Sequence, residues 1–134
     1  QDINVHIYDL RPYINALANK VSGKGYENTN NYRNAEIKFM DISNIHAVRE
    51  AHNKVLSLIQ YLDNEKFPSI LESSNWLQFI SSILNAAVTI IEKSLKKSIS
   101  VLVHCSDGWD RTTQIVSLIQ IMVDPYYRSI EGFE

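Results

Sequence analysis

Cysteine is nearly absent from this sequence of 134 residues, which contains only Cys105. A single cysteine excludes an intrachain disulfide and fits a reducing compartment, in which a reactive thiol survives. No apolar run approaches the roughly 20 residues of a membrane span, and no signal peptide opens the chain. The sequence also lacks an excess of positive charge, because its net charge is -2. We therefore do not expect nucleic acid as a partner.

Metal-ligand spacings are missing as well. His104 has no second cysteine or spaced histidine pair to accompany it, and His46 and His52 are too far apart for an i,i+4 pair on a helix. We expect no metal ion and no cofactor. His46 and His52 are interpreted as solvated or capping residues, and His104 as a residue that orients its loop or tunes a neighbouring thiolate.

Repeats, low-complexity segments and interdomain linkers are absent too, so the chain is one ordinary domain or a piece of one. Apolar and polar residues alternate in some segments and recur at helical spacing in others. The pattern predicts strands near residues 4–10, 35–42 and 98–103, and helices near 45–62, 74–97 and 112–123. Strands that alternate with helices indicate an α/β layered sheet, with functional loops at the carboxyl ends of the strands.

Shorter features lie between these elements. Asp9 and Arg11 are interpreted as a structural ion pair near a strand end. A helical turn is expected over 15–21 with Ala16, Leu17 and Val21 facing inward, and Ser22-Gly-Lys-Gly25 is read as a turn. The longer helices should each bury one apolar face. The inward residues expected on them are Val48, Ala51, Val55, Ile59, Leu62, Trp76, Phe79, Ile80, Ile83, Leu84, Ala87, Ile90, Ile91, Leu95, Ile115, Leu118, Ile119 and Met122.

One stretch combines a strand, a tight loop and a helix around Cys105 and Arg111. Such a loop points backbone N–H groups inward at the N-terminus of the helix, which makes a site for a phosphate dianion. Unpaired N–H groups, the helix dipole and a guanidinium all favour a thiolate at Cys105. Arg111 can bind two phosphate oxygens at once while the thiolate attacks phosphorus.

The leaving alkoxide needs a proton, and Asp110 is the first candidate for the general acid, with Asp107 as the other. Trp109 is expected to shape or shield the pocket. The spacing Cys-x5-Arg alone is a weak signal, because an arginine follows a cysteine at this distance by chance about one time in twenty. The alternative is that Cys105 is a small buried hydrophobic residue at a strand end.

The segment His104-Cys-Ser-Asp-Gly-Trp-Asp-Arg-Thr112 resembles the signature loop of the myotubularin family of phosphoinositide 3-phosphatases. Tyr126 to Glu134 resembles the family's continuation. Four upstream segments resemble family segments in the same order, so the resemblance covers essentially the whole chain. These segments are Ile7–Pro12, Asn15–Lys20, Gly23–Glu27 and Met40–His46.

The resemblance implies the cysteine-dependent phosphatase fold and removal of the 3-phosphate from phosphatidylinositol 3-phosphate and its 3,5-bisphosphate. It also implies work at a membrane surface, a cytoplasmic location peripheral to endosomal membranes, and homo- or hetero-oligomers with other family members as a state to test. The loop residues Ser106, Asp107, Gly108 and Trp109 match substrate-binding positions. Asn19, Asn44 and Ile45 match positions that line the family's phosphoinositide pocket.

Two other functions share parts of this pattern. A protein tyrosine or dual-specificity phosphatase usually takes its acid from an upstream Trp-Pro-Asp loop, and that tripeptide does not occur here. A non-catalytic family member that serves as a binding module lacks the cysteine or the arginine, and both are present. Family enzymes also carry an N-terminal lipid-binding domain and further helices after the signature region. We therefore expect a catalytic domain truncated at its C-terminus, which alone binds a hydrophobic dye and shows little lipid phosphatase activity.

Overall fold

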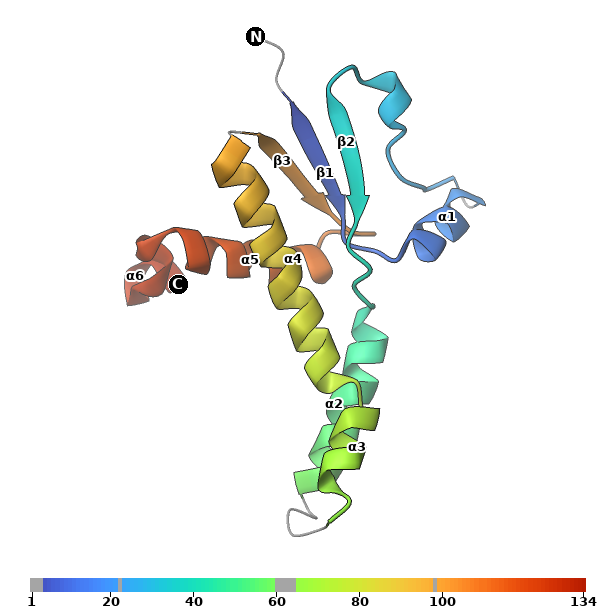
Figure 1. Cartoon of the computed structure of the whole chain (residues 1–134), viewed down its shortest axis with the longest axis vertical. Helices are drawn as coiled ribbons and strands as arrows, with labels where there is room; N and C mark the ends of the chain where they lie inside the picture. The colour runs from blue at the N-terminus through green and yellow to red at the C-terminus, as the bar shows by residue number, and fades with distance from the viewer. Residues whose placement is uncertain (1–3, 22, 60–64, 98) are drawn as a thin grey trace.

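The computed structural model describes residues 4–21, 23–59, 65–97 and 99–134. Its centre is a sheet of three parallel strands in the order β2-β1-β3 (Figure 1). The strands are β1 (Val5–Asp9), β2 (Ala35–Phe39) and β3 (Ser100–His104). The predicted α/β organisation with a parallel sheet is confirmed, although the second strand ends three residues earlier than expected.

Helices connect these strands, as parallel pairing requires. The connection from β1 to β2 contains α1 (Tyr13–Val21) and the short 3-10 turn η1 (Thr29–Asn31). In Figure 1, α2 leads away from the sheet, the chain turns through α3, and α4 returns beside β3. These helices span Ile45–Ile59, Phe67–Ser73 and Trp76–Lys97. After β3 the chain forms α5 (Arg111–Val123), η2 (Pro125–Arg128) and α6 (Ile130–Phe133).

The short helix α3 is not among the helices that the sequence pattern predicts, and it begins at Phe67-Pro68. Proline is tolerated in the first turn of a helix, where its missing N–H has no partner to lose, and Pro68 occupies that turn. A side-chain cap precedes α4: the backbone N–H of Trp76 donates to Ser74 Oγ at 3.1 Å. Asn75 has a φ of 62°, which separates α3 from α4.

The core lies between the sheet and the helices α4 and α5. Its buried members come from every layer, and they are Tyr8, Leu10, Ile42, Ala86, Ile90, Cys105 and Ile115. Cys105 thus contributes to the core as well as to the loop. Among the described residues, no single helix is long and apolar enough to cross a bilayer, although α3 taken with most of α4 passes that test as a pair bent by 50°.

Several helix faces differ from the prediction. On α1 only Ala16 is buried, while Leu17 and Val21 are exposed, because this helix lies at the margin of the sheet (Figure 1). Other residues expected in the core face solvent on α4 and α5, namely Ile80, Leu84, Leu95 and Met122. Ala86 and Leu58 are buried instead. Leu62 and the side chain of Ile59 lie outside the described residues.

The arrangement of strands explains where the site forms. Asp9 at the end of β1 is the register partner of His104 at the end of β3, so the segments that follow both strands begin side by side. β1 is the central strand. The chain that follows it continues to β2 on one side, and the chain that follows β3 on the other side continues into α5. Ligands of open α/β sheets bind in the crevice at such a point, outside the carboxyl ends of the strands.

Candidate active site at the carboxyl edge of the sheet

Residues 105–110 form the tight connection between β3 and α5. Gly108 has a φ of 82°, a conformation that residues with a side chain rarely adopt. Thr113 in the first turn of α5 donates its hydroxyl to the carbonyls of Gly108 (3.2 Å) and Trp109 (3.0 Å). The loop is therefore fixed to the helix that follows it, and the predicted strand, loop and helix are all present.

The Cys105 side chain is buried, and the pKa of its thiol is lowered to about 7. Burial by itself raises this pKa, because it disfavours the charged thiolate. Hydrogen bonds from the Thr112 side chain and from the backbone N–H groups of Thr112, Gly108 and Asp107 lower it by more. Thr112 Oγ1 is itself buried and has no other hydrogen-bond partner in the described part of the chain.

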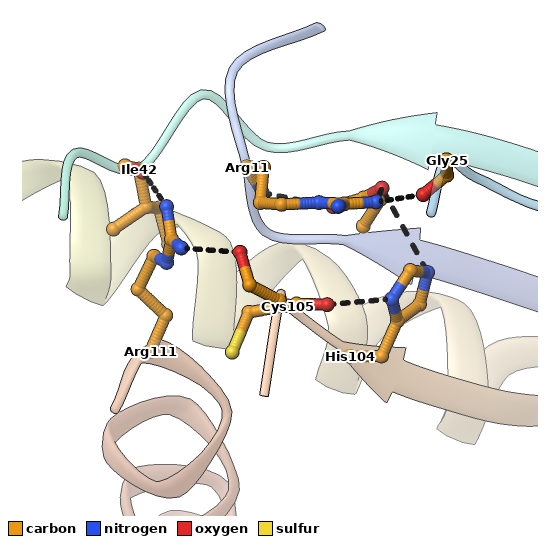
Figure 2. A network of polar contacts seen from close by, with 8 residues as sticks. Arg11, Gly25, Ile42, His104, Cys105 and Arg111 are labelled. Atoms are coloured by element: carbon orange, nitrogen blue, oxygen red, sulfur yellow. Dashed lines mark hydrogen bonds and ion pairs between the residues drawn. The ribbon is translucent and has the colours of Figure 1, made fainter. Parts of the chain in front are cut away.

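Arg111 begins α5 and lies across the loop from Cys105 (Figure 2). Its guanidinium is buried and donates from Nη1 to the carbonyl of Ile42 (3.3 Å) and from Nη2 to Ser106 Oγ (3.2 Å). Its Nε is buried without a partner within the described ranges. A buried donor without an acceptor is costly, and an anionic oxygen is the ligand that would satisfy it best.

The two aspartates of the loop are placed differently. Asp110 is half-buried and its Oδ1 accepts a hydrogen bond from Gln114 Nε2 at 2.7 Å, one turn along α5. Asp107 is exposed, and it contributes its backbone N–H to the Cys105 sulfur. Trp109 is 64% exposed and does not line the cavity beside Cys105.

A cavity of about 550 Å³ opens beside Cys105 on the side facing the segment after α1. Cys105 and Ser106 line it together with Asn19, which the resemblance had assigned to the pocket. Asn44 and Ile45 do not line it. Asn44 instead caps α2, its Oδ1 accepting the backbone N–H groups of His46 (3.1 Å) and Ala47 (3.2 Å). This cap follows directly on Ile42, whose carbonyl accepts from Arg111.

A buried ion pair between Asp9 and Arg11 borders the cavity, which Arg11 lines. Arg11 donates from Nε to Asp9 Oδ1 (2.9 Å), from Nη2 to Asp9 Oδ2 (2.6 Å), and from its backbone N–H to Oδ1 (3.0 Å). The hydrogen bond to Asp9 raises the pKa of Arg11, while burial opposes this. His104 lies beside the pair in Figure 2, its Nε2 3.9 Å from Asp9 Oδ2 and its Nδ1 3.1 Å from the carbonyl of Cys105.

That carbonyl can only accept, so Nδ1 of His104 carries a proton. His104 therefore holds the first residue of the loop through this contact, in agreement with its expected role in orienting the loop. In the described ranges, no group of three histidine, cysteine, aspartate or glutamate side chains is arranged to hold a metal ion.

Three residues of the site were not recognised from the sequence as functional. Thr112 was seen only as the end of the signature, although a hydroxyl directly after the helix-initiating arginine is the available signal. Arg11 was interpreted as structural, and its position on the cavity wall could not be read from its neighbours. Lys24 lines the same wall from a segment that was read as a turn.

These observations define an α/β protein with a buried thiol of lowered pKa at the carboxyl end of a parallel strand and the N-terminus of a helix beside it. The chain belongs to the Myotubularin-like phosphatase domain family, which it matches over residues 1–134.

Individual relatives are similar along nearly the whole chain. Myotubularin of Xenopus laevis is 47% identical, and the match covers 100% of this chain and 22% of that protein. The human phosphatidylinositol-3,5-bisphosphate 3-phosphatase MTMR6 is 45% identical, covering 96% and 21%. The mouse phosphatidylinositol-3-phosphate phosphatase MTMR7 is 43% identical, covering 96% and 20%. The chain thus spans about a fifth of the length of these relatives.

Proposed function

We propose that this chain carries the catalytic loop of a phosphoinositide 3-phosphatase with the cysteine-dependent phosphatase fold. Its substrates would be phosphatidylinositol 3-phosphate and phosphatidylinositol 3,5-bisphosphate, the lipids in the names of MTMR7 and MTMR6. The observation that carries the proposal is the position of the Cys105 thiol directly after β3, where hydrogen bonds from Thr112, Gly108 and Asp107 favour the thiolate and lower its pKa to about 7.

The reaction then proceeds in two displacements. The Cys105 thiolate attacks phosphorus, a sulfur–phosphorus bond forms, and the bond from phosphorus to the inositol oxygen breaks. Arg111 stabilises the charge on the transferred group, since its Nε is a buried donor without a partner among the described residues. Water next attacks the cysteinyl-phosphate, inorganic phosphate leaves, and the thiolate is restored.

Asp110 is proposed to protonate the inositol oxygen as it leaves. Its carboxyl is half-buried at the start of α5 and is held by Gln114, whereas Asp107 is exposed. General acid catalysis contributes about 10²- to 10⁴-fold in rate. The Asp110→Asn variant should therefore lose about this factor on lipid but much less on an aryl phosphate, whose leaving group needs little protonation. A contrast of this size at Asp107→Asn instead would assign the acid to Asp107.

The proposed substrates are lipids, so the site would act at a membrane surface. We propose the cytoplasmic face of endosomal membranes as this surface, and homo- or hetero-oligomers with other family members as the assembled state. Both follow from the family resemblance.

The test is phosphate release, by a protein that continues beyond Glu134, from a panel of phosphoinositides and a phosphotyrosine peptide. Release from the two 3-phosphorylated lipids, and from no lipid without a 3-phosphate, is the expected result. Preferential release from the phosphotyrosine peptide would replace the proposal with a protein phosphatase. In the Cys105→Ser background, binding of the headgroups with no release from any substrate would separate recognition from turnover.

A further inference from the structure

Residues 24–27 form one wall of the cavity beside Cys105. The position of this wall is fixed by contacts with three other parts of the chain. Arg11 Nη2 donates to the carbonyl of Gly25 at 2.7 Å, and the backbone N–H of Lys24 donates to the carbonyl of Asn19 at 3.1 Å. The ring of Tyr26 packs against those of Phe39 (5.2 Å between centroids) and Tyr13 (5.8 Å).

Arg11 is therefore the link between this wall and the buried base of the site. The same Nη2 that donates to Gly25 also donates to Asp9 Oδ2, so Gly25 is tied to a carboxylate at the end of β1. Figure 2 shows Arg11 extending from its strand end toward Gly25, with His104 and Cys105 on the neighbouring segment. A lysine at position 11 would keep the charge but could not make these bonds together.

The charges on the wall are not equivalent. Arg11 is compensated by Asp9, and Glu27 accepts a hydrogen bond from the hydroxyl of Tyr32 at 3.0 Å. Lys24 forms no ion pair with any described residue; it is exposed and is one of the residues that line the cavity. Its ammonium is thus the cation that remains for a ligand, on a cavity shared with the nucleophile.

We propose that Lys24 is a specificity-determining residue that binds a second phosphate group on the inositol ring, and that Arg11 is the positioning residue that holds it there. This inference rests on the proposed function, in which Cys105 and Arg111 take the 3-phosphate. Lys24 then favours a bisphosphorylated headgroup over a monophosphorylated one, because only the former places a second dianion in the cavity.

The test compares two soluble headgroups in the Cys105→Ser background, where binding is measured without turnover. Inositol 1,3-bisphosphate stands for the monophosphorylated lipid and inositol 1,3,5-trisphosphate for the bisphosphorylated one. Lys24→Met should weaken binding of inositol 1,3,5-trisphosphate by about fivefold or more. It should weaken binding of inositol 1,3-bisphosphate by less than about twofold. The control is Lys38→Met, which removes an exposed lysine on β2 that does not line this cavity.

An equal change for both headgroups, or no change for either, would overturn the role of Lys24. Failure of the Cys105→Ser protein to bind either headgroup would instead overturn the proposed function, and this assignment with it. The two failures are thus distinguishable.

The positioning role of Arg11 is tested by a double-mutant cycle. In the Arg11→Lys background, Lys24→Met should have a smaller effect on the ratio of the two affinities than in the parent, because the lysine is no longer held over the cavity. Circular dichroism identifies an Arg11→Lys protein that has not folded, in which case Asp9→Glu, which shifts the same anchor, replaces it. An undiminished effect of Lys24→Met in a folded background would contradict the positioning role.

Discussion

At the carboxyl edge of the sheet the charged side chains of Asp9, Arg11 and Arg111 are buried, whereas on α1 the apolar side chains of Ile14 and Val21 face solvent. The usual distribution of polarity is inverted in both regions. At the carboxyl edge, the burial of charge is compensated by short hydrogen bonds, such as those of Arg11 to Asp9. On α1, the described residues leave the side chains of Ile14 and Val21 uncovered.

The difference shows that the two regions depend on different interactions. The carboxyl edge depends on a few directional contacts, so the loss of one partner leaves a buried charge uncompensated. The exposed apolar faces make few contacts, so a single substitution there removes almost no stabilising interaction. Single substitutions should therefore change activity or the free energy of unfolding much more at the carboxyl edge than on the exposed faces.

Replacement of the nucleophile should have the largest effect. Cys105→Ser should abolish turnover while phosphate binding survives through the loop N–H groups and Arg111, since no other covalent step is available. Arg111→Lys should fail to restore normal turnover, because an ammonium cannot reproduce the geometry of a guanidinium. Steady-state phosphate release measures both. More than a few per cent of parental turnover in Cys105→Ser would show that the mechanism is wrong.

Removal of charge from Asp9 should have the next largest effect. Asp9→Asn leaves Arg11 buried beside a neutral amide, and the expected loss in the free energy of unfolding is about 3 to 5 kcal/mol. The matched control is Glu50→Gln, which breaks the exposed pair between Glu50 and Lys54 (3.2 Å) and should cost no more than about 0.5 kcal/mol. Urea unfolding followed by circular dichroism measures both. Similar losses would mean that burial does not decide the contribution of these pairs.

The hydroxyl of Thr112 should affect reactivity more than stability. Alkylation of Cys105 by iodoacetamide should increase with pH around a midpoint near 7, because the thiolate is the reacting form. Thr112→Val removes the hydroxyl that lowers this pKa, so the midpoint should move upward, while Thr112→Ser should restore it. The lowered pKa also affects folding. Ionisation of the thiol stabilises the folded state fully at a pH above the pKa of the unfolded thiol, and this contribution is lost as pH falls through about 7. An unchanged midpoint in Thr112→Val would show that the Thr112 hydroxyl does not lower the pKa of Cys105.

Substitution on the exposed face should have the smallest effect. Val21 is 93% exposed, so Val21→Lys should change the free energy of unfolding by no more than about 0.5 kcal/mol. The chain of residues 1–134 should bind the dye ANS through such faces, and Val21→Lys with Ile14→Lys should reduce the fluorescence. Ala16→Lys on the same helix should be far more destabilising, since Ala16 is fully buried. Strong destabilisation by Val21→Lys, or absence of ANS binding, would show that this face is covered.

The sequence by itself determined how the strands and the longer helices follow one another along the chain, because hydrophobic periodicity is a local property. It also determined the placement of Cys105 and Arg111 at the two ends of one loop, since six residues between a strand and a helix leave little freedom. Ser74 as a cap was equally local, depending on hydrogen bonds between neighbours.

Only the tertiary structure decided which faces are buried and which distant residues share the site. Leu17, Leu84 and Leu95 follow helical spacing but face solvent, because periodicity specifies a face and not the partner that covers it. Arg11 and Lys24 reach the Cys105 cavity because strands distant in sequence pair in register, which brings Asp9 beside His104. Strand order and register arise from long-range contacts, and no local pattern encodes them.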